Sequence, residues 1–244
     1  MSRVRDPFSE LRSFLRAALV IPLPRDHEES DAAFRHRRVV TLATLAAGAV
    51  LLAVALRIRP GDALFYPATL LLALVWTGGA LLSGRLYLGR ARTRAGGSDA
   101  LPVVQALALG IGLVLLFLAG SVAVARIPVL REPVDTLLDH ARFGSLPLVG
   151  ALTALNGIAE ELYFRGAAYA AVGRRHGVLV TTLAYALVTA ASGVPLLVFA
   201  AACLGLVTGM QRRVTGGVLG PIVTHLTFSM GMLLLLPQAL GLFG

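Results

Sequence analysis

Long apolar stretches separated by short polar segments dominate the chain after residue 38. A helix needs about 20 mainly apolar residues to cross the roughly 30 Å hydrocarbon core of a bilayer. The stretches that approach this length predict membrane-spanning helices near residues 39–57, 63–83, 101–125, 146–172, 177–192, 195–211 and 216–236. The fifth and sixth are short and meet at Ser192 and Gly193, and the final segment, Pro237 to Gly244, is too short to cross alone. The pattern therefore predicts an all-α, polytopic helix bundle of about seven spans, with eight as the alternative.

Residues 1–38 are polar and rich in arginine, and they lack the charged, apolar and cleavage regions of a signal peptide. Within this segment, Glu10 to Leu23 has the pattern of an amphipathic helix lying on the membrane surface. A partly disordered cytoplasmic tail is the alternative, and the sequence alone leaves both open.

Composition supports a membrane protein. The 244 residues are 57% hydrophobic and 14% charged, against about 45–50% apolar and 25% charged in soluble domains. The formal net charge is +9, and all 22 basic side chains are arginine. Most of these arginines cluster in the N-terminal tail and in the gaps between the apolar stretches, which indicates membrane orientation and not nucleic-acid binding. The single cysteine, Cys203, lies within an apolar stretch and excludes a disulfide within the chain.

The arginine-rich segments predict the orientation. With seven alternating spans, the N-terminal tail and three connections fall on one side of the membrane; those connections carry Arg85, Arg90, Arg92 and Arg94, then Arg174 and Arg175, then Arg212 and Arg213. Cytoplasmic loops are enriched in arginine and lysine, so this side is predicted to be cytoplasmic. The opposite connection, residues 126–142, is expected to be a loop of mixed charge.

Two glutamates and an arginine interrupt the fourth apolar stretch, at Glu160, Glu161 and Arg165. Ionisable groups are costly in a membrane and usually mark function. Because adjacent helical residues point about 100° apart, the two glutamates are not expected to face one partner. Glu161 is predicted to pair with Arg165 one turn later. Glu160 is then predicted to face a polar pocket, with Asn156 one turn before it on the same side.

A histidine in the last span is predicted to reach the same depth. Glu160 lies 13 residues from Gly173, or roughly 20 Å along the helix, and His225 lies 9 residues from Gly216, or roughly 14 Å. His225 and Ser229 share a helix face. A carboxylate in such a pocket suits a general base that takes a proton from water. The alternatives are a structural ion pair with a core histidine, or an ion or proton pathway.

The segment from Glu160 to Arg165, EELYFR, resembles the EExxxR motif of the CPBP family, the CAAX-processing and bacteriocin-processing intramembrane endopeptidases. The segment from Ala201 to Met230 resembles the family's closing region, with Gly205, Gly209, Gly216, Pro221 and His225 in the expected order. The resemblance covers about residues 100–240. It divides the chain into a basic cytoplasmic tail (1–38), two additional spans with an arginine-rich loop (39–100) and a protease-like core (101–244).

The resemblance implies proteolysis within the membrane, at a site reached from the cytoplasmic side. Glu160 would activate water together with a histidine of the next helix, and Glu161 and Arg165 would support the site. His225 and the polar residue four positions later, here Ser229 in place of the usual asparagine, would bind the oxyanion. The family's second motif, FxxxH, aligns with residues 185–189, where Thr189 replaces the histidine. Threonine does not accept a proton near neutral pH.

Two hypotheses follow. The first is an intramembrane endopeptidase in which Glu160, alone or with His225, activates water against a membrane-associated protein or peptide. The second is a catalytically silent relative that acts as a membrane scaffold, immunity factor or peptide-binding protein; a proton-coupled transporter is a less favoured third.

The lipid bilayer is the expected environment, the chain is expected to be a multi-pass protein of the plasma membrane, and no nucleic acid is expected as a partner. No cofactor is expected, because one histidine and one free carboxylate are too few ligands for zinc. Nothing in the sequence distinguishes a prenyl pocket from a peptide groove.

Overall fold

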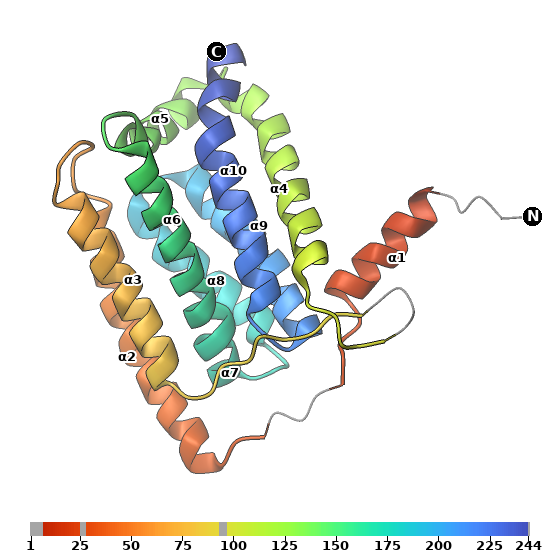
Figure 1. The fold of residues 1–244 in the computed structure, drawn as a ribbon. Helices are drawn as coiled ribbons and strands as arrows, with labels where there is room; N and C mark the ends of the chain where they lie inside the picture. Colours follow the sequence, from red (N-terminus) through yellow and green to blue (C-terminus); the bar gives the residue numbers. More distant parts are fainter. Residues whose placement is uncertain (1–6, 25–27, 93–96, 244) are drawn as a thin grey trace, which may run out of the picture.

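The computed structural model describes residues 7–24, 28–92 and 97–243, and its regular structure there is helical (Figure 1). The helices are α1 (Pro7–Leu19), α2 (Asp31–Ala55), α3 (Phe65–Leu82), α4 (Val103–Val124), α5 (Pro128–Arg142), α6 (Leu146–Glu161), α7 (Tyr169–Val172), α8 (Gly177–Thr189), α9 (Pro195–Thr215) and α10 (Leu219–Phe243). A π-helical segment, Leu162–Ala168, joins α6 to α7, and a 3₁₀ turn, Ala190–Ser192, follows α8.

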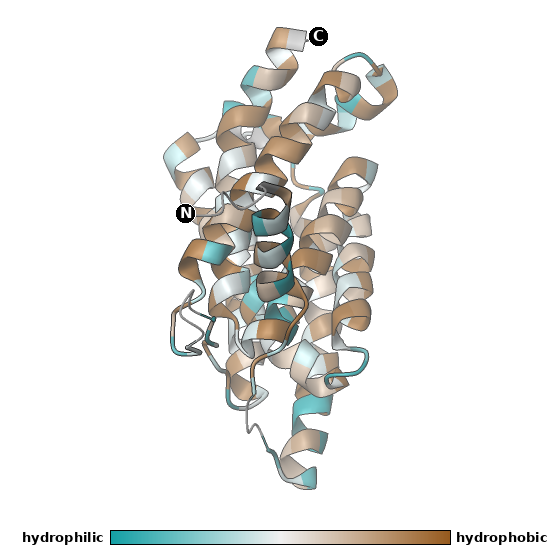
Figure 2. Cartoon of the chain, turned by 90° about the vertical axis from the view of Figure 1, so that its right-hand side faces the viewer, coloured by the Kyte–Doolittle hydropathy of each residue, from teal (hydrophilic) through white to brown (hydrophobic). Residues whose placement is uncertain are grey.

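The long helices confirm a polytopic membrane bundle. Among the described residues, five helices are long and apolar enough to cross a membrane, namely α2, α3, α4, α9 and α10, and the segment of α8 with its 3₁₀ turn is a shorter apolar helix. The continuous segment of α6, the π-helical segment and α7 follows the predicted fourth span closely. Apolar residues predominate along these helices (Figure 2). Each of the seven predicted spans therefore corresponds to a helical segment.

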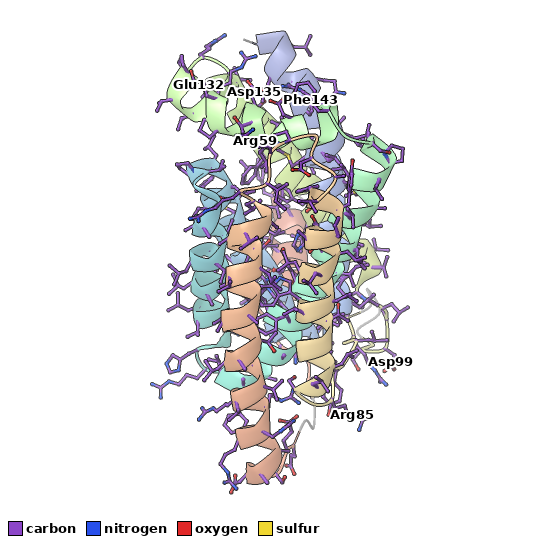
Figure 3. The ribbon with its side chains drawn as sticks, turned by 90° about the vertical axis from the view of Figure 1, so that its left-hand side faces the viewer. Arg59, Arg85, Asp99, Glu132, Asp135 and Phe143 are labelled. Atoms are coloured by element: carbon purple, nitrogen blue, oxygen red, sulfur yellow. The ribbon has the colours of Figure 1, made fainter. Side chains whose placement is uncertain are left out.

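The bundle has two ends that differ in charge. One end, which we call the arginine face, carries the start of α2, the connection from α3 to α4, the turn between α7 and α8 and the turn between α9 and α10 (Figure 1). The opposite end, which we call the α5 face, carries the α2–α3 connection, α5 and the α8–α9 turn. Figure 3 shows Arg85 at the first end and Arg59, Glu132 and Asp135 at the second.

Backbone hydrogen bonds hold the connections of the arginine face together. The amides of Val218 and Leu219 donate to the carbonyls of Tyr87 and Leu88, at 2.9 and 3.0 Å. The amide of Leu23 donates to the carbonyl of Val214 at 3.0 Å, which fixes the chain after α1 against the end of α9. This end of the bundle is therefore built from segments that are distant in sequence.

Glycines allow close helix contacts inside the bundle. A Cβ atom on Gly48 of α2 would lie 2.2 Å from the indole of Trp76 in α3, so only glycine fits there. A Cβ on Gly209 of α9 would lie 3.2 Å from Val178 in α8, and one on Gly205 would lie 3.3 Å from Thr182. The small-residue spacing from Gly205 to Gly209 therefore serves packing within the bundle.

The prediction of a loop over residues 126–142 was wrong. Residues 128–142 form α5, whose Val134 and Leu138 are buried against the ends of α4 and α10. Ion pairs on its polar side join Arg131 to Asp135 at 3.1 Å and Arg142 to Asp139 at 3.2 Å. The mixed charge that suggested a loop is the polar side of an amphipathic helix.

The segment before the first predicted span contains helical residues. Residues 7–19 form α1, the helical alternative, with Phe8 and Leu11 exposed on its surface, whereas residues 1–6 and 25–27 lie outside the described part. Residues 31–38 of the predicted tail are helical, because α2 begins at Asp31 after the cap Ser30. Arg37 is 1% exposed and pairs with Glu29. Its guanidinium also donates to the Ser83 hydroxyl, at 3.2 Å, and thus fixes the start of α2 to the end of α3.

The C-terminal segment and the end of α9 extend the predicted spans. The segment after Pro237 continues α10 to Phe243 instead of forming a separate piece. Arg212 and Arg213 belong to the last turn of α9, and Arg212 is buried. Its Nε donates to the carbonyl of Arg165 at 2.6 Å, so this arginine supports the π-helical segment as well as the charge of the arginine face.

Candidate active site

The two glutamates end α6 where the helix widens. Glu160 and Glu161 are its last residues, and the π-helical segment with i to i+5 bonding begins at Leu162. Such segments are rare and often lie at functional sites. Every residue from Tyr163 to Ala168 is buried, so the widened turn is held on all sides by its neighbours.

Glu161 lies at the centre of a buried polar group. Its Oε1 lies 3.0 Å from Nη1 of Arg165, and both side chains are 0% exposed. The predicted pairing of these two residues is confirmed. The guanidinium also lies over the rings of Tyr185 and Phe164, with its carbon 5.0 and 5.8 Å from the ring centres, where the electron-rich faces stabilise its charge.

His225 of α10 binds the same carboxylate. Its Nδ1 lies 2.8 Å from Oε1 of Glu161, the oxygen that pairs with Arg165. A carboxylate held by an arginine accepts hydrogen bonds only, so His225 is the donor at Nδ1. This bond fixes the ring and directs Nε2 towards the neighbouring glutamate.

Glu160 faces the other side of the imidazole. Its Oε2 lies 3.9 Å from Nε2 of His225 and accepts a hydrogen bond from the hydroxyl of Tyr185 at 2.7 Å. The expectation that the adjacent glutamates do not share a partner was therefore wrong. The imidazole has polar atoms on two edges, and so it bridges two carboxylates that leave the helix in different directions.

Gly157 allows α10 to approach at this point. A Cβ atom there would lie 3.3 Å from Cδ2 of His225, which is closer than most side-chain contacts. Asn156, one residue earlier, is held by its own amide, which donates to the carbonyls of Thr69 and Leu152 at 3.2 and 3.0 Å. Asn156 therefore links α6 to α3 beside the site.

A cavity of about 240 Å³ adjoins these groups. Glu160 and His225 line it together with other polar side chains predicted for the site: Asn156, Thr189 and Ser229. The hydroxyl of Thr189 donates to the carbonyl of Tyr185 at 2.8 Å, within its own helix. The structure thus brings the predicted residues to one cavity, except Glu161 and Arg165, which lie behind it.

A second, larger cavity lies next to the first. It measures about 640 Å³ and is lined mainly by apolar side chains of α4, α5, α9 and α10. Thr153, Phe228 and Ser229 line both cavities, so the two are neighbours. The rings of Phe117, Phe199 and Phe228 cluster along this second cavity, with Phe117 5.8 and 5.1 Å from the other two.

Tyr185 is the site residue that sequence reasoning missed. It was considered only as the first position of the degenerate second motif, yet its hydroxyl contacts Glu160 and its ring packs 4.9 Å from that of Phe164. The signal was present, because a tyrosine stood where the family motif has phenylalanine.

The described side chains do not suit a zinc ion. Within residues 7–24, 28–92 and 97–243, no three His, Cys, Asp or Glu side chains are grouped as metal ligands. Glu161 is already engaged by Arg165 and His225 through Oε1. The prediction that no cofactor is needed stays a prediction.

Comparison with known proteins identifies the same region. The model of the family described as type II CAAX prenyl endopeptidase Rce1-like matches residues 142–231, a span that starts later than the residues 100–240 inferred from motifs. No curated protein and no solved structure matches the chain significantly. The matched region includes both glutamates, Arg165, His225 and Ser229. Residues 142–231 are thus Rce1-like, which confirms the predicted resemblance and is consistent with a member of the CPBP family.

Proposed function

We propose that this chain is an intramembrane endopeptidase that hydrolyses a peptide bond of a membrane-associated protein or peptide. One observation carries the proposal. Glu160 faces a cavity inside a membrane bundle, with His225 and Tyr185 against its carboxyl group, and the family match covers this region. A partly buried carboxylate that pairs with no arginine among the described residues is a suitable general base.

In the proposed reaction, Glu160 takes a proton from a water molecule in the cavity, and the water oxygen attacks the carbonyl carbon of the substrate. The carbonyl oxygen becomes an oxyanion, for which the Ser229 hydroxyl is the donor. Collapse of this intermediate breaks the carbon–nitrogen bond. Glu160 returns its proton to the leaving amine, so one peptide and one water give a carboxyl and an amino terminus.

His225 has a second role available in this chain. While neutral, it donates from Nδ1 to Glu161, so Nε2 is an acceptor that faces Glu160 at 3.9 Å. One water molecule placed between Glu160 and Nε2 would contact both. His225 would then assist the glutamate, the work that a second-motif histidine does where Thr189 stands here.

Arg165, Glu161 and Tyr185 are proposed to position the reacting side chains. Arg165 holds Glu161, Glu161 holds the imidazole, and Tyr185 holds Glu160. The adjoining apolar cavity of about 640 Å³ supports a substrate with an apolar portion next to the scissile bond, including a lipid-modified tail of the kind named in the family description.

The chain is proposed to be a multi-pass protein of the plasma membrane with a cytoplasmic N-terminus. Arginines concentrated on one end of the bundle support this orientation.

A catalytically silent membrane protein that binds peptides is the second candidate. The observation in its favour is Thr189, which lines the cavity where the family motif has a histidine, and whose hydroxyl is engaged by the carbonyl of Tyr185. Such a protein would retain the cavity and its binding without hydrolysis.

The test is cleavage of a library of transmembrane and tail peptides by purified protein in lipid. Wild type is expected to cleave, and Glu160→Gln is expected to lose at least 10²-fold in rate, since a general base contributes about 10²–10⁴-fold. Glu132→Gln, at an exposed carboxylate on α5, is the matched control and should cleave as wild type. Equal cleavage by Glu160→Gln would exclude the glutamate mechanism. Binding without cleavage in all three proteins would favour the silent alternative.

A further inference from the structure

The cavity of about 240 Å³ that adjoins Glu160, which we call the catalytic cavity, extends from the site towards the α5 face. Glu160 and His225 are near its inner end, whereas Leu56 of the α2–α3 connection, Phe65 at the start of α3 and Leu197 near the start of α9 line its other end. These last three residues lie at the α5 face of the bundle. The larger cavity continues in the same direction, because Val134, Leu137 and Leu138 of α5 form part of its wall.

The part of the bundle between the glutamates and the arginine face is tightly packed. Tyr163, Phe164 and Trp76 are each at most 1% exposed, and the ring centres of Trp76 and Tyr163 are 4.5 Å apart. On the other side of the site, Thr208 and Gln211 of α9 are at most 2% exposed. A ring of buried side chains therefore separates Glu160 from the arginine face.

The two ends of the bundle also differ in charge, because the arginine face has the larger excess of positive residues. The described arginines of the arginine face are Arg35, Arg37, Arg38, Arg85, Arg90, Arg92, Arg174, Arg175, Arg212 and Arg213, and the described acidic residues there are Glu28, Glu29, Asp31 and Asp99. At the α5 face, Asp62, Glu132, Asp135 and Asp139 offset Arg57, Arg59, Arg126, Arg131 and Arg142. The bias predicts that the α5 face is the non-cytoplasmic one.

From these observations we propose that the site receives its substrate from the α5 face, and that this face is on the non-cytoplasmic side of the membrane. The inference rests on the proposed function for its chemistry. The substrate is then a segment of a membrane-anchored or exported protein whose scissile bond reaches Glu160 from the outer side. This differs from the cytoplasmic access implied by the sequence resemblance, and the direction of the cavity is the reason.

Part of the wall of the cavity is formed by elements that the family match does not include. Leu52, Ala55 and Leu56 of α2 and Phe65 and Thr69 of α3 line the catalytic cavity, and all lie outside residues 142–231. The two N-terminal spans therefore form one wall of the substrate path. Differences in substrate choice between this chain and other Rce1-like proteins are expected to arise at this wall.

Thiol labelling in sealed membrane vesicles tests the proposal without requiring catalysis. In a Cys203→Ala background, four single-cysteine variants are made: Ala63→Cys on the α5 face, Ser98→Cys on the arginine face, Thr153→Cys in the shared wall of the two cavities and Thr208→Cys as its buried control. Each is exposed to a membrane-impermeant maleimide in right-side-out and in inside-out vesicles. Detergent-solubilised samples show that each thiol is reactive.

Ala63→Cys and Thr153→Cys are expected to react in right-side-out vesicles only, and Ser98→Cys in inside-out vesicles only. Thr208→Cys should react in neither. Reaction of Thr153→Cys from the same side as Ser98→Cys would overturn the direction of access. Absence of reaction at Thr153→Cys in both vesicle types would overturn an open path, and reaction of Ala63→Cys only in inside-out vesicles would overturn the orientation.

The outcome is separable from the protease proposal. If Thr153→Cys reacts from the α5 face while the purified protein cleaves no peptide in the library, access is supported and the proposed chemistry fails. If peptides are cleaved only when they are supplied to the arginine face of oriented vesicles, the chemistry stands and the proposed access fails.

Discussion

The imidazole of His225 bridges Glu161 and Glu160, with Nδ1 2.8 Å from the first carboxylate and Nε2 3.9 Å from the second. Glu161 is fixed by its buried ion pair with Arg165. The hydrogen bond between Glu161 and His225 in turn fixes the imidazole, whose Nε2 faces Glu160. The two glutamates thereby have different roles. Glu161 orients the histidine, and Glu160 faces the cavity.

Loss of one member of the buried pair should destabilise the fold. Arg165→Met leaves Glu161 without its counter-charge in a site that is 0% exposed, and breaking such a pair costs about 3–5 kcal/mol. The apparent Tm of the variant in detergent should fall clearly below that of wild type. Arg165→Met combined with Glu161→Gln should lose less stability than the sum of the two single changes. Strict additivity would show that the two side chains do not interact energetically.

Tyr185→Phe should slow the reaction without disturbing the fold. It removes the 2.7 Å hydrogen bond to Glu160 but keeps the ring that packs against Phe164. Hydrogen bonds to charged groups contribute about 1.5–3 kcal/mol, which corresponds to about 10–100-fold in rate. The decrease is expected in kcat, measured on a peptide that wild type cleaves. A rate equal to that of wild type would mean that Tyr185 does not orient the base.

Thr189→His should restore the residue of the family motif at a position that already lines the cavity. A histidine there adds a proton acceptor beside Glu160, and a general base contributes about 10²–10⁴-fold. The rate of peptide cleavage is expected to rise at least tenfold over wild type, and Thr189→Asn, which adds bulk without a base, serves as the control. An equal rise in both variants would assign the effect to cavity shape.

Gly48→Ala should weaken the packing of α2 on α3. The added methyl group would lie 2.2 Å from the indole of Trp76, and overpacking of this kind typically costs about 1–3 kcal/mol. Gly78→Ala in α3 is the matched control, because a Cβ there meets nothing within 4 Å. Thermal unfolding in detergent should show a lower Tm for the first variant and no decrease for the second. Equal Tm values would mean that α2 shifts to relieve the contact.

Several features follow from local sequence because local geometry decides them. The spans are set by the length of apolar stretches, and the pairing of Glu161 with Arg165 is set by the i to i+4 spacing of a helix. The amphipathic pattern of α5 was also local, but its balanced charges were interpreted as a loop.

Other features depend on which helices are neighbours, and no local pattern encodes that. Only the packing of α10 against α6 places His225 between the glutamates, and only the packing of α8 brings Tyr185 to Glu160. The direction of the cavity is decided by where side chains leave space between helices. Apolar residues both fill the part of the bundle near the arginine face and line the cavity, so residue type alone does not distinguish the two parts. The sequence by itself therefore determined the spans and the chemistry available, while the tertiary structure decided how the groups meet and from which side they are reached.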